Sequence, residues 1–150
     1  MGQYDSVEDV IDFAIDKEIE ANQFYLALAK RTDNPAMCRV FEDFAKEELG
    51  HKAKLEAMKK GKNTLATNSA VDLKIADYIV DIEPGDDMNY SDTLIIAMKK
   101  EKASFHLYTD LAEEVENKDQ REVFLALAKE EANHKLRFEL EYDNIVLKEN

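Results

Sequence analysis

Residues 44–52 read FAKEELGHK and residues 126–135 read ALAKEEANHK, so the pattern AKEExxHK occurs twice in a chain of 150 residues. In each copy a glutamate and a histidine stand three residues apart, which places both side chains on one face of an α-helix. Phenylalanine, alanine and leucine occupy the neighbouring positions on that face. The repeated pattern therefore predicts two helices that carry ionisable side chains where an apolar core is expected.

Composition favours one all-α domain spanning residues 1–150. A hydrophobic content of 45% is enough for one core, and four glycines and two prolines are few for a turn-rich β fold. The net charge of −13 predicts a protein that binds neither nucleic acid nor an anionic membrane surface, because both would be repelled. A cation is a more natural ligand for such a chain.

The first residues and the cysteine content predict a cytoplasmic protein. The start, MGQYDSVEDV, has no basic segment followed by an apolar run, and no stretch of the chain has the length and hydrophobicity of a membrane span. Cys38 is the single cysteine, so an internal disulfide is impossible and a reducing compartment is expected.

The chain contains an internal repeat with an offset of 83 residues. Residues 9–56 align with residues 92–139 without gaps, and about 17 of these 48 positions carry the same residue. Polar residues that favour helix starts occur at equivalent points of both halves. We therefore predict four helices, over residues 6–31, 35–60, 90–116 and 118–147.

The two halves are joined by a linker, residues 61–89, that is longer than a helical hairpin requires. It begins and ends with turn-forming residues, and a short helix is possible near residues 72–80. A connection of this length can run along a bundle, so that the second and third helices lie parallel. The sequence thus predicts two helical hairpins joined by one long crossover.

Ionisable side chains interrupt the apolar stripe of every predicted helix, near its middle. The six residues are Glu18, Glu48, His51, Glu101, Glu131 and His134. One such residue alone would indicate a surface charge or a salt bridge. Four buried carboxylates are different, because each unpaired buried ion costs several kcal/mol in a domain stable by only about 5 to 15 kcal/mol. Two divalent cations would balance four negative charges, so the stripes predict a dinuclear metal site.

This ligand pattern, with one glutamate from each of two helices and a Glu-x-x-His pair from each of the others, resembles that of the ferritin-like diiron bundles. The segments KEIEANQFY (17–25) and KKEKASFHLY (99–108), the doubled AKEExxHK and the long linker look most like the rubrerythrin family. The resemblance covers nearly the whole chain and implies a ferritin-like four-helix bundle with two iron ions. It further implies that Glu18 and Glu101 are terminal ligands, that Glu48 and Glu131 bridge the metals, and that His51 and His134 each hold one metal. Manganese or zinc would also suit these ligands.

Two features depart from the rubrerythrin pattern. Rubrerythrins carry a rubredoxin domain with two CxxC pairs that delivers electrons, whereas this chain has one cysteine, so we expect a separate electron-donor protein. They also carry a further glutamate three residues after the third-helix ligand, implicated in ligand exchange, where this chain has Ser104. At both points this chain lacks a feature that the resemblance associates with peroxide reductase activity.

Several residues near the stripes have alternative interpretations. Tyr25 and Tyr108 stand seven residues beyond Glu18 and Glu101, and their hydroxyls either bind ligand carboxylates or simply pack in the core. Cys38 is expected to pack as a small apolar side chain. We set aside as ligands Glu20, which points roughly away from Glu18 on its helix, and three residues that lie beside the stripes, namely Glu47, Glu130 and His106.

The expected function is that of a non-haem diiron oxidoreductase, of peroxide reductase or ferroxidase type, that protects a cytoplasm from oxidants. Its substrate would be peroxide or dioxygen, and the long linker and the family resemblance predict a homodimer in which one hairpin can be exchanged. The chief alternative is a non-catalytic protein that sequesters iron or another divalent metal. A third interpretation is a structural helical dimer held together by its metals.

Overall fold

The structure, a computed structural model, describes residues 6–61, 73–80, 82 and 88–149. Within these ranges it contains four α-helices and one short 3-10 helix and has no strand. The elements are α1 (Val7–Arg31), α2 (Pro35–Lys60), η1 (Ile75–Tyr78), α3 (Tyr90–Glu114) and α4 (Lys118–Glu149). The predicted all-α class is confirmed, and the four predicted helices differ from the observed ones by at most two residues at either end.

Side-chain caps explain why the helices begin where they do. An oxygen of the residue before each helix accepts a hydrogen bond from a backbone N–H in the first turn, at 2.8 to 3.3 Å. The four capping residues are Ser6, Asn34, Asn89 and Asn117. Each cap satisfies a backbone donor that would otherwise have no partner within the helix, and such a cap typically contributes about 1 kcal/mol.

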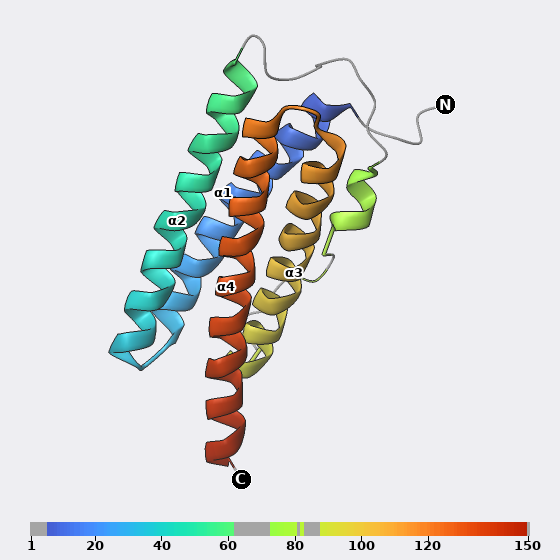
Figure 1. The fold of residues 1–150 in the computed structure, drawn as a ribbon. Helices are drawn as coiled ribbons and strands as arrows, with labels where there is room; N and C mark the ends of the chain where they lie inside the picture. Colours follow the sequence, from blue (N-terminus) through green and yellow to red (C-terminus); the bar gives the residue numbers. More distant parts are fainter. Residues whose placement is uncertain (1–5, 62–72, 81, 83–87, 150) are drawn as a thin grey trace.

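The helices form two antiparallel hairpins, α1 with α2 and α3 with α4, that pack against each other (Figure 1). Between the hairpins, α1 lies beside α3 and α2 lies beside α4. Helices α2 and α3 run in the same direction, as Figure 1 shows, so the predicted crossover topology is confirmed. This arrangement brings the middles of all four helices to the same level of the bundle.

Most of the predicted linker, residues 61–89, lies outside the described residues. Within its described part, the short helix expected near residues 72–80 is the 3-10 helix η1. Tyr78, at the end of η1, donates a hydrogen bond of 2.7 Å from its hydroxyl to Asp110 Oδ2 on α3. This bond holds η1 against the outside of the second hairpin.

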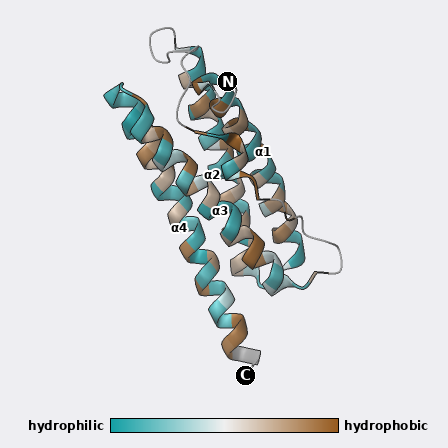
Figure 2. Ribbon diagram, turned by 90° about the vertical axis from the view of Figure 1, so that its right-hand side faces the viewer, coloured by the Kyte–Doolittle hydropathy of each residue, from teal (hydrophilic) through white to brown (hydrophobic). Residues whose placement is uncertain are grey.

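Two apolar layers fill the interior at different heights of the bundle. One contains Ile11, Leu55, Leu111 and Phe124 among its buried side chains. The other is built from Leu28, Met37, Phe41, Leu94 and Phe138, with further side chains around them. Hydrophobic and hydrophilic residues alternate along each helix, as expected for helices with one buried face (Figure 2).

No helix in the described part of the chain combines the length and the apolar character that a membrane crossing requires. At its C-terminal end, α4 continues past the ends of its neighbours (Figure 1). The bundle proper is therefore shorter than α4, and its centre lies between the two apolar layers.

Candidate metal centre

All six residues predicted from the interrupted stripes meet at the centre of the bundle, between the apolar layers. Each is buried, with at most 2% of its surface exposed. They are Glu18 of α1, Glu48 and His51 of α2, Glu101 of α3, and Glu131 and His134 of α4. Every helix thus contributes at least one ionisable side chain to a site enclosed by apolar residues.

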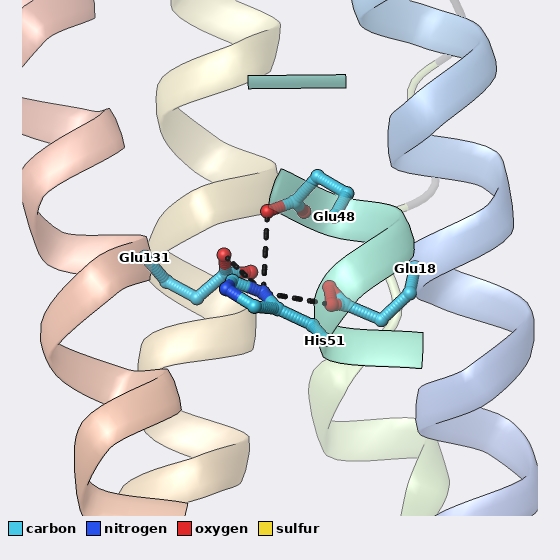
Figure 3. A group of neighbouring side chains, drawn as sticks. All are labelled: Glu18, Glu48, His51 and Glu131. Carbon is cyan, nitrogen blue, oxygen red and sulfur yellow. Dashed lines mark hydrogen bonds and ion pairs between the residues drawn. The ribbon is translucent and has the colours of Figure 1, made fainter. Parts of the chain in front are cut away.

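The six side chains form two overlapping groups. Glu18, Glu48, His51 and Glu131 each offer one oxygen or nitrogen atom such that these atoms lie within 4.8 Å of one another. Figure 3 shows these four side chains pointing toward a common point. Glu48, Glu101, Glu131 and His134 form a second group with the same spacing. Glu48 and Glu131 belong to both groups, so they lie between the two positions.

Both histidines turn Nδ1 toward the carboxylates. Nδ1 of His51 lies 3.1 Å from Glu18 Oε2, 3.2 Å from Glu131 Oε1 and 3.4 Å from Glu48 Oε1. Nδ1 of His134 lies 3.3 Å from Glu48 Oε1. It also lies 3.7 Å from oxygens of Glu101 and Glu131. Each half of the cluster therefore combines one imidazole nitrogen with oxygens from three carboxylates.

The polar atoms of the cluster are not satisfied by the protein alone. Among the described residues, both side-chain oxygens of Glu48 and of Glu131, Glu101 Oε2 and His134 Nδ1 have no hydrogen-bond partner. Buried polar groups normally have a hydrogen-bond partner. Each one without a partner costs about 1 to 3 kcal/mol of stability, and a charged group costs more. Carboxylate oxygens and imidazole nitrogens are ligands that divalent iron, manganese and zinc accept. The residues present therefore fit a dinuclear metal site.

The electrostatics of the cluster lead to the same interpretation. Burial raises the pKa of all four carboxyl groups, and repulsion from neighbouring carboxylates adds to this for Glu18, Glu48 and Glu131. Burial alone would lower the pKa of His134, but its contacts with Glu101 and Glu48 raise that pKa to about 11. Without a metal, the cluster thus holds more protons than the same side chains would hold in water, and cations would take the place of these protons.

Two tyrosines contact the carboxylates from the opposite hairpin. The Tyr25 hydroxyl, on α1, donates a hydrogen bond to Glu101 Oε1, on α3. Burial raises the pKa of Tyr108, on α3, and nearby carboxylates, including a hydrogen-bonded Glu18 on α1, raise it further. Of the two interpretations, the structure supports hydrogen bonding to a carboxylate for Tyr25, and the electrostatic surroundings of Tyr108 agree with the same role.

Two glutamates that we set aside as ligands contact the histidines. Glu47 and Glu130 are 45% and 37% exposed, as expected for residues beside the stripe. Even so, Glu47 Oε2 lies 3.1 Å from His134 Nε2, and Glu130 Oε2 lies 3.4 Å from His51 Nε2. Both contacts join different hairpins. The signal for them in the sequence is the glutamate pair, EE, present in both copies of the motif.

The other residues near the stripes do not belong to the cluster. Cys38 is half-buried and packs against the apolar layer that contains Phe41, in agreement with the expected apolar role. His106 is exposed beside Phe105. Ser104 is half-buried and lines a cavity of about 40 Å³ that Glu101 also lines. Ser104, the residue at which this chain differs from the rubrerythrin pattern, thus lies next to the cluster.

Comparisons with known proteins agree with this geometry. The family model described as Rubrerythrin matches residues 9–142. A Thermotoga maritima structure described as a ferritin-like diiron-carboxylate protein is similar, with a TM-score of 0.84, 23% identity, and coverage of 95% of this chain and 98% of that chain. The structure of a hypothetical protein from Pyrococcus furiosus is also similar, with a TM-score of 0.73, 24% identity, and coverage of 94% of this chain and 90% of that chain. At these identities the two structures establish the ferritin-like fold alone.

Curated proteins give no match to this sequence. The family assignment therefore depends on the family model, whose match covers α2 and α3 completely, most of α1 and α4, and all six residues of the cluster. The chain belongs to the rubrerythrin family.

Proposed function

We propose that this protein is a non-haem diiron oxidoreductase, of peroxide reductase or ferroxidase type, that protects a cytoplasm from oxidants. The observation that carries the proposal is the pair of overlapping ligand groups that share Glu48 and Glu131. Four acidic and two imidazole side chains, all buried, have no evident role in a purely structural bundle because their burial is costly. A site for two divalent cations accounts for all of them.

In this proposal the six residues have distinct roles. Glu18 and His51 would hold one metal, and Glu101 and His134 would hold the other. Glu48 and Glu131 would contribute to both metals, because each belongs to both groups. Iron is the proposed metal, and manganese or zinc would fit the same oxygen and nitrogen donors.

When bound, two ferrous ions would supply the two electrons that reduce a peroxide or dioxygen molecule. The chain provides the surroundings for that chemistry. The two apolar layers limit the access of water to the cluster from either end of the bundle. The cavity beside Glu101 and Ser104 measures about 40 Å³, which leaves space for only a few water-sized molecules. A small oxidant therefore suits this side of the cluster better than a bulky one.

Further electrons for repeated turnover would come from a separate electron-donor protein. The 150 residues contain one cysteine, Cys38, which is half-buried in an apolar layer near the start of α2 and has no cysteine partner in the sequence. We also propose a homodimer as the assembled form, in line with the long connection between the hairpins.

The second candidate function is metal sequestration without turnover, and Ser104 is the observation that favours it. Ser104 stands where rubrerythrins carry a further glutamate, and it lies beside Glu101 at the cavity. A serine hydroxyl cannot replace a carboxylate that exchanges between metal positions during a redox cycle. The metal site would then be retained while its catalytic cycle is impaired.

A metal analysis followed by a peroxide assay separates the two candidates. Protein loaded with Fe²⁺ without oxygen should contain two metals per chain, and should then consume many equivalents of hydrogen peroxide when an external reductant is supplied. Peroxide consumption that stops at the iron content would indicate sequestration. His134→Ala should lose one metal, whereas Glu139→Ala, at a partly exposed position of the same helix that pairs with Lys135, should behave as the wild type. A wild-type chain that binds no metal would refute both candidates.

A further inference from the structure

The outward nitrogens of the two histidines face partly exposed glutamates of the opposite hairpin. His134 Nε2, on α4, forms a hydrogen bond of 3.1 Å with Glu47 Oε2, on α2. His51 Nε2, on α2, lies 3.4 Å from Glu130 Oε2, on α4. Glu47 and Glu130 are equivalent positions of the repeat, 83 residues apart. The two contacts are therefore crossed copies of one arrangement, in which each hairpin supports the other's histidine.

We propose that Glu47 is a positioning residue that holds His134 ready to bind metal, and that Glu130 does the same, more weakly, for His51. A neutral imidazole has one N–H and one lone pair, and the partner of the N–H decides which nitrogen is free to bind. A carboxylate that accepts from Nε2–H leaves the Nδ1 lone pair facing the cluster. The proposal rests on the proposed function of the cluster as a metal centre.

The contact between Glu47 and His134 is shorter than the contact between Glu130 and His51, and the surroundings of the two imidazole rings differ in the same sense. The His134 ring also stacks on Phe44, with ring centroids 3.9 Å apart and an interplanar angle of 21°. His51 Nε2 has no hydrogen bond among the described residues, and Lys54 Nζ lies 3.9 Å from the same Glu130 oxygen. Lys54 thus competes with His51 for Glu130. The position bound by Glu101 and His134 should therefore be the better preorganised of the two.

Glutamate-to-alanine variants with matched controls test this inference. Glu47→Ala is compared with Glu56→Ala, which removes a glutamate of similar exposure on the same helix that pairs with Lys52 instead of a histidine. Co²⁺ binding is followed by calorimetry and by visible absorption. Glu47→Ala should weaken one of the two binding events about 10- to 100-fold, the usual effect of removing such a supporting carboxylate. Glu56→Ala should bind as the wild type does.

Two further variants extend the comparison. Glu130→Ala should weaken the other binding event, by a smaller factor than Glu47→Ala, relative to Glu139→Ala as its control. Glu47→Gln keeps an oxygen that can accept from Nε2–H and should restore much of the affinity. Circular dichroism establishes that each variant is folded, which is expected because these glutamates are partly exposed.

A second measurement reports on the imidazole itself. In Zn²⁺-loaded protein with ¹⁵N-labelled histidine, the Nε2–H of His134 should exchange slowly with solvent in the wild type. It should exchange faster in Glu47→Ala and at an intermediate rate in Glu47→Gln. Wild-type Co²⁺ affinity together with unchanged exchange in Glu47→Ala would overturn the inference and leave the metal centre intact. A wild-type chain that binds no Co²⁺ would overturn the metal centre and the inference together.

Discussion

Replacing Tyr25 by phenylalanine tests whether the tyrosine hydroxyl supports the cluster across the two hairpins. The hydroxyl donates to Glu101 Oε1, and Tyr25 is 1% exposed, so no water can replace the lost donor without a rearrangement. The ring itself packs against Phe138, with centroids 5.3 Å apart, and phenylalanine keeps that packing. The substitution therefore removes one buried hydrogen bond and little else.

The size of the effect follows from the surroundings of Glu101. Its other oxygen, Oε2, has no hydrogen-bond partner among the described residues, so the substitution leaves the carboxyl group without its one strong donor. The loss should be about 1 kcal/mol if Glu101 is protonated in the metal-free protein and up to about 3 kcal/mol if it is ionised. For a chain of this length, that free energy lowers the melting temperature by about 2 to 12 °C. Binding of the metal that we propose is held by Glu101 and His134 should weaken about tenfold or more.

Calorimetric melts of the metal-free protein and Co²⁺ titrations measure both effects. Tyr90→Phe is the matched control, because the Tyr90 hydroxyl donates to Glu141 Oε2 at 3.2 Å, away from the cluster. The control should lower the melting temperature modestly and leave both metal affinities unchanged. If Tyr25→Phe changes neither the melting temperature nor the metal affinity, the hydroxyl does not support the cluster and the reasoning is refuted.

Three further predictions concern pH, packing and assembly. The pKa values of the four carboxyl groups are raised in the folded protein, so the folded metal-free protein holds more protons than the unfolded chain. The contribution of these protons to stability is complete below about pH 4.5, the pKa of a glutamate in the unfolded chain. It is lost as the pH rises through the pKa values of the folded state. The melting temperature of the metal-free protein should be lower at pH 8 than at pH 5.5, and added metal should raise it at pH 8. The double variant Glu48→Gln with Glu131→Gln should bind no metal pair, and its melting temperature should depend less on pH. Equal melting temperatures of the metal-free wild type at both pH values would contradict this. Phe138→Ala, at a fully buried ring, should lower the free energy of unfolding in urea by about 3 to 5 kcal/mol, whereas Leu140→Ala, at 52% exposure, should change it by less than about 0.5 kcal/mol. Sedimentation at micromolar concentration should show a homodimer, and a monomer there would rule out the proposed assembly.

The helices and the composition of the cluster could be predicted from the sequence because both depend on local periodicity. A side chain that recurs every three or four residues lies on one helical face whatever the helix packs against. Caps such as Ser6 and Asn89 act within one turn, so they mark helix starts without any tertiary information. The six interruptions of the apolar stripes therefore predicted the residues of the cluster, and the structure brings these residues together.

Contacts between the hairpins could not be predicted in the same way, and the roles of Glu47, Glu130, Tyr25 and Ser104 depend on them. Helical periodicity places Glu47 beside the stripe and partly in solvent, which is correct for α2 alone. Only the packing of α2 beside α4 brings its carboxylate to His134 Nε2, and only the pairing of α1 with α3 brings the Tyr25 hydroxyl to Glu101. Periodicity determines the direction of a side chain relative to its own helix axis. The partner it meets depends on the distance and rotation between helices, which the packing of the whole core decides.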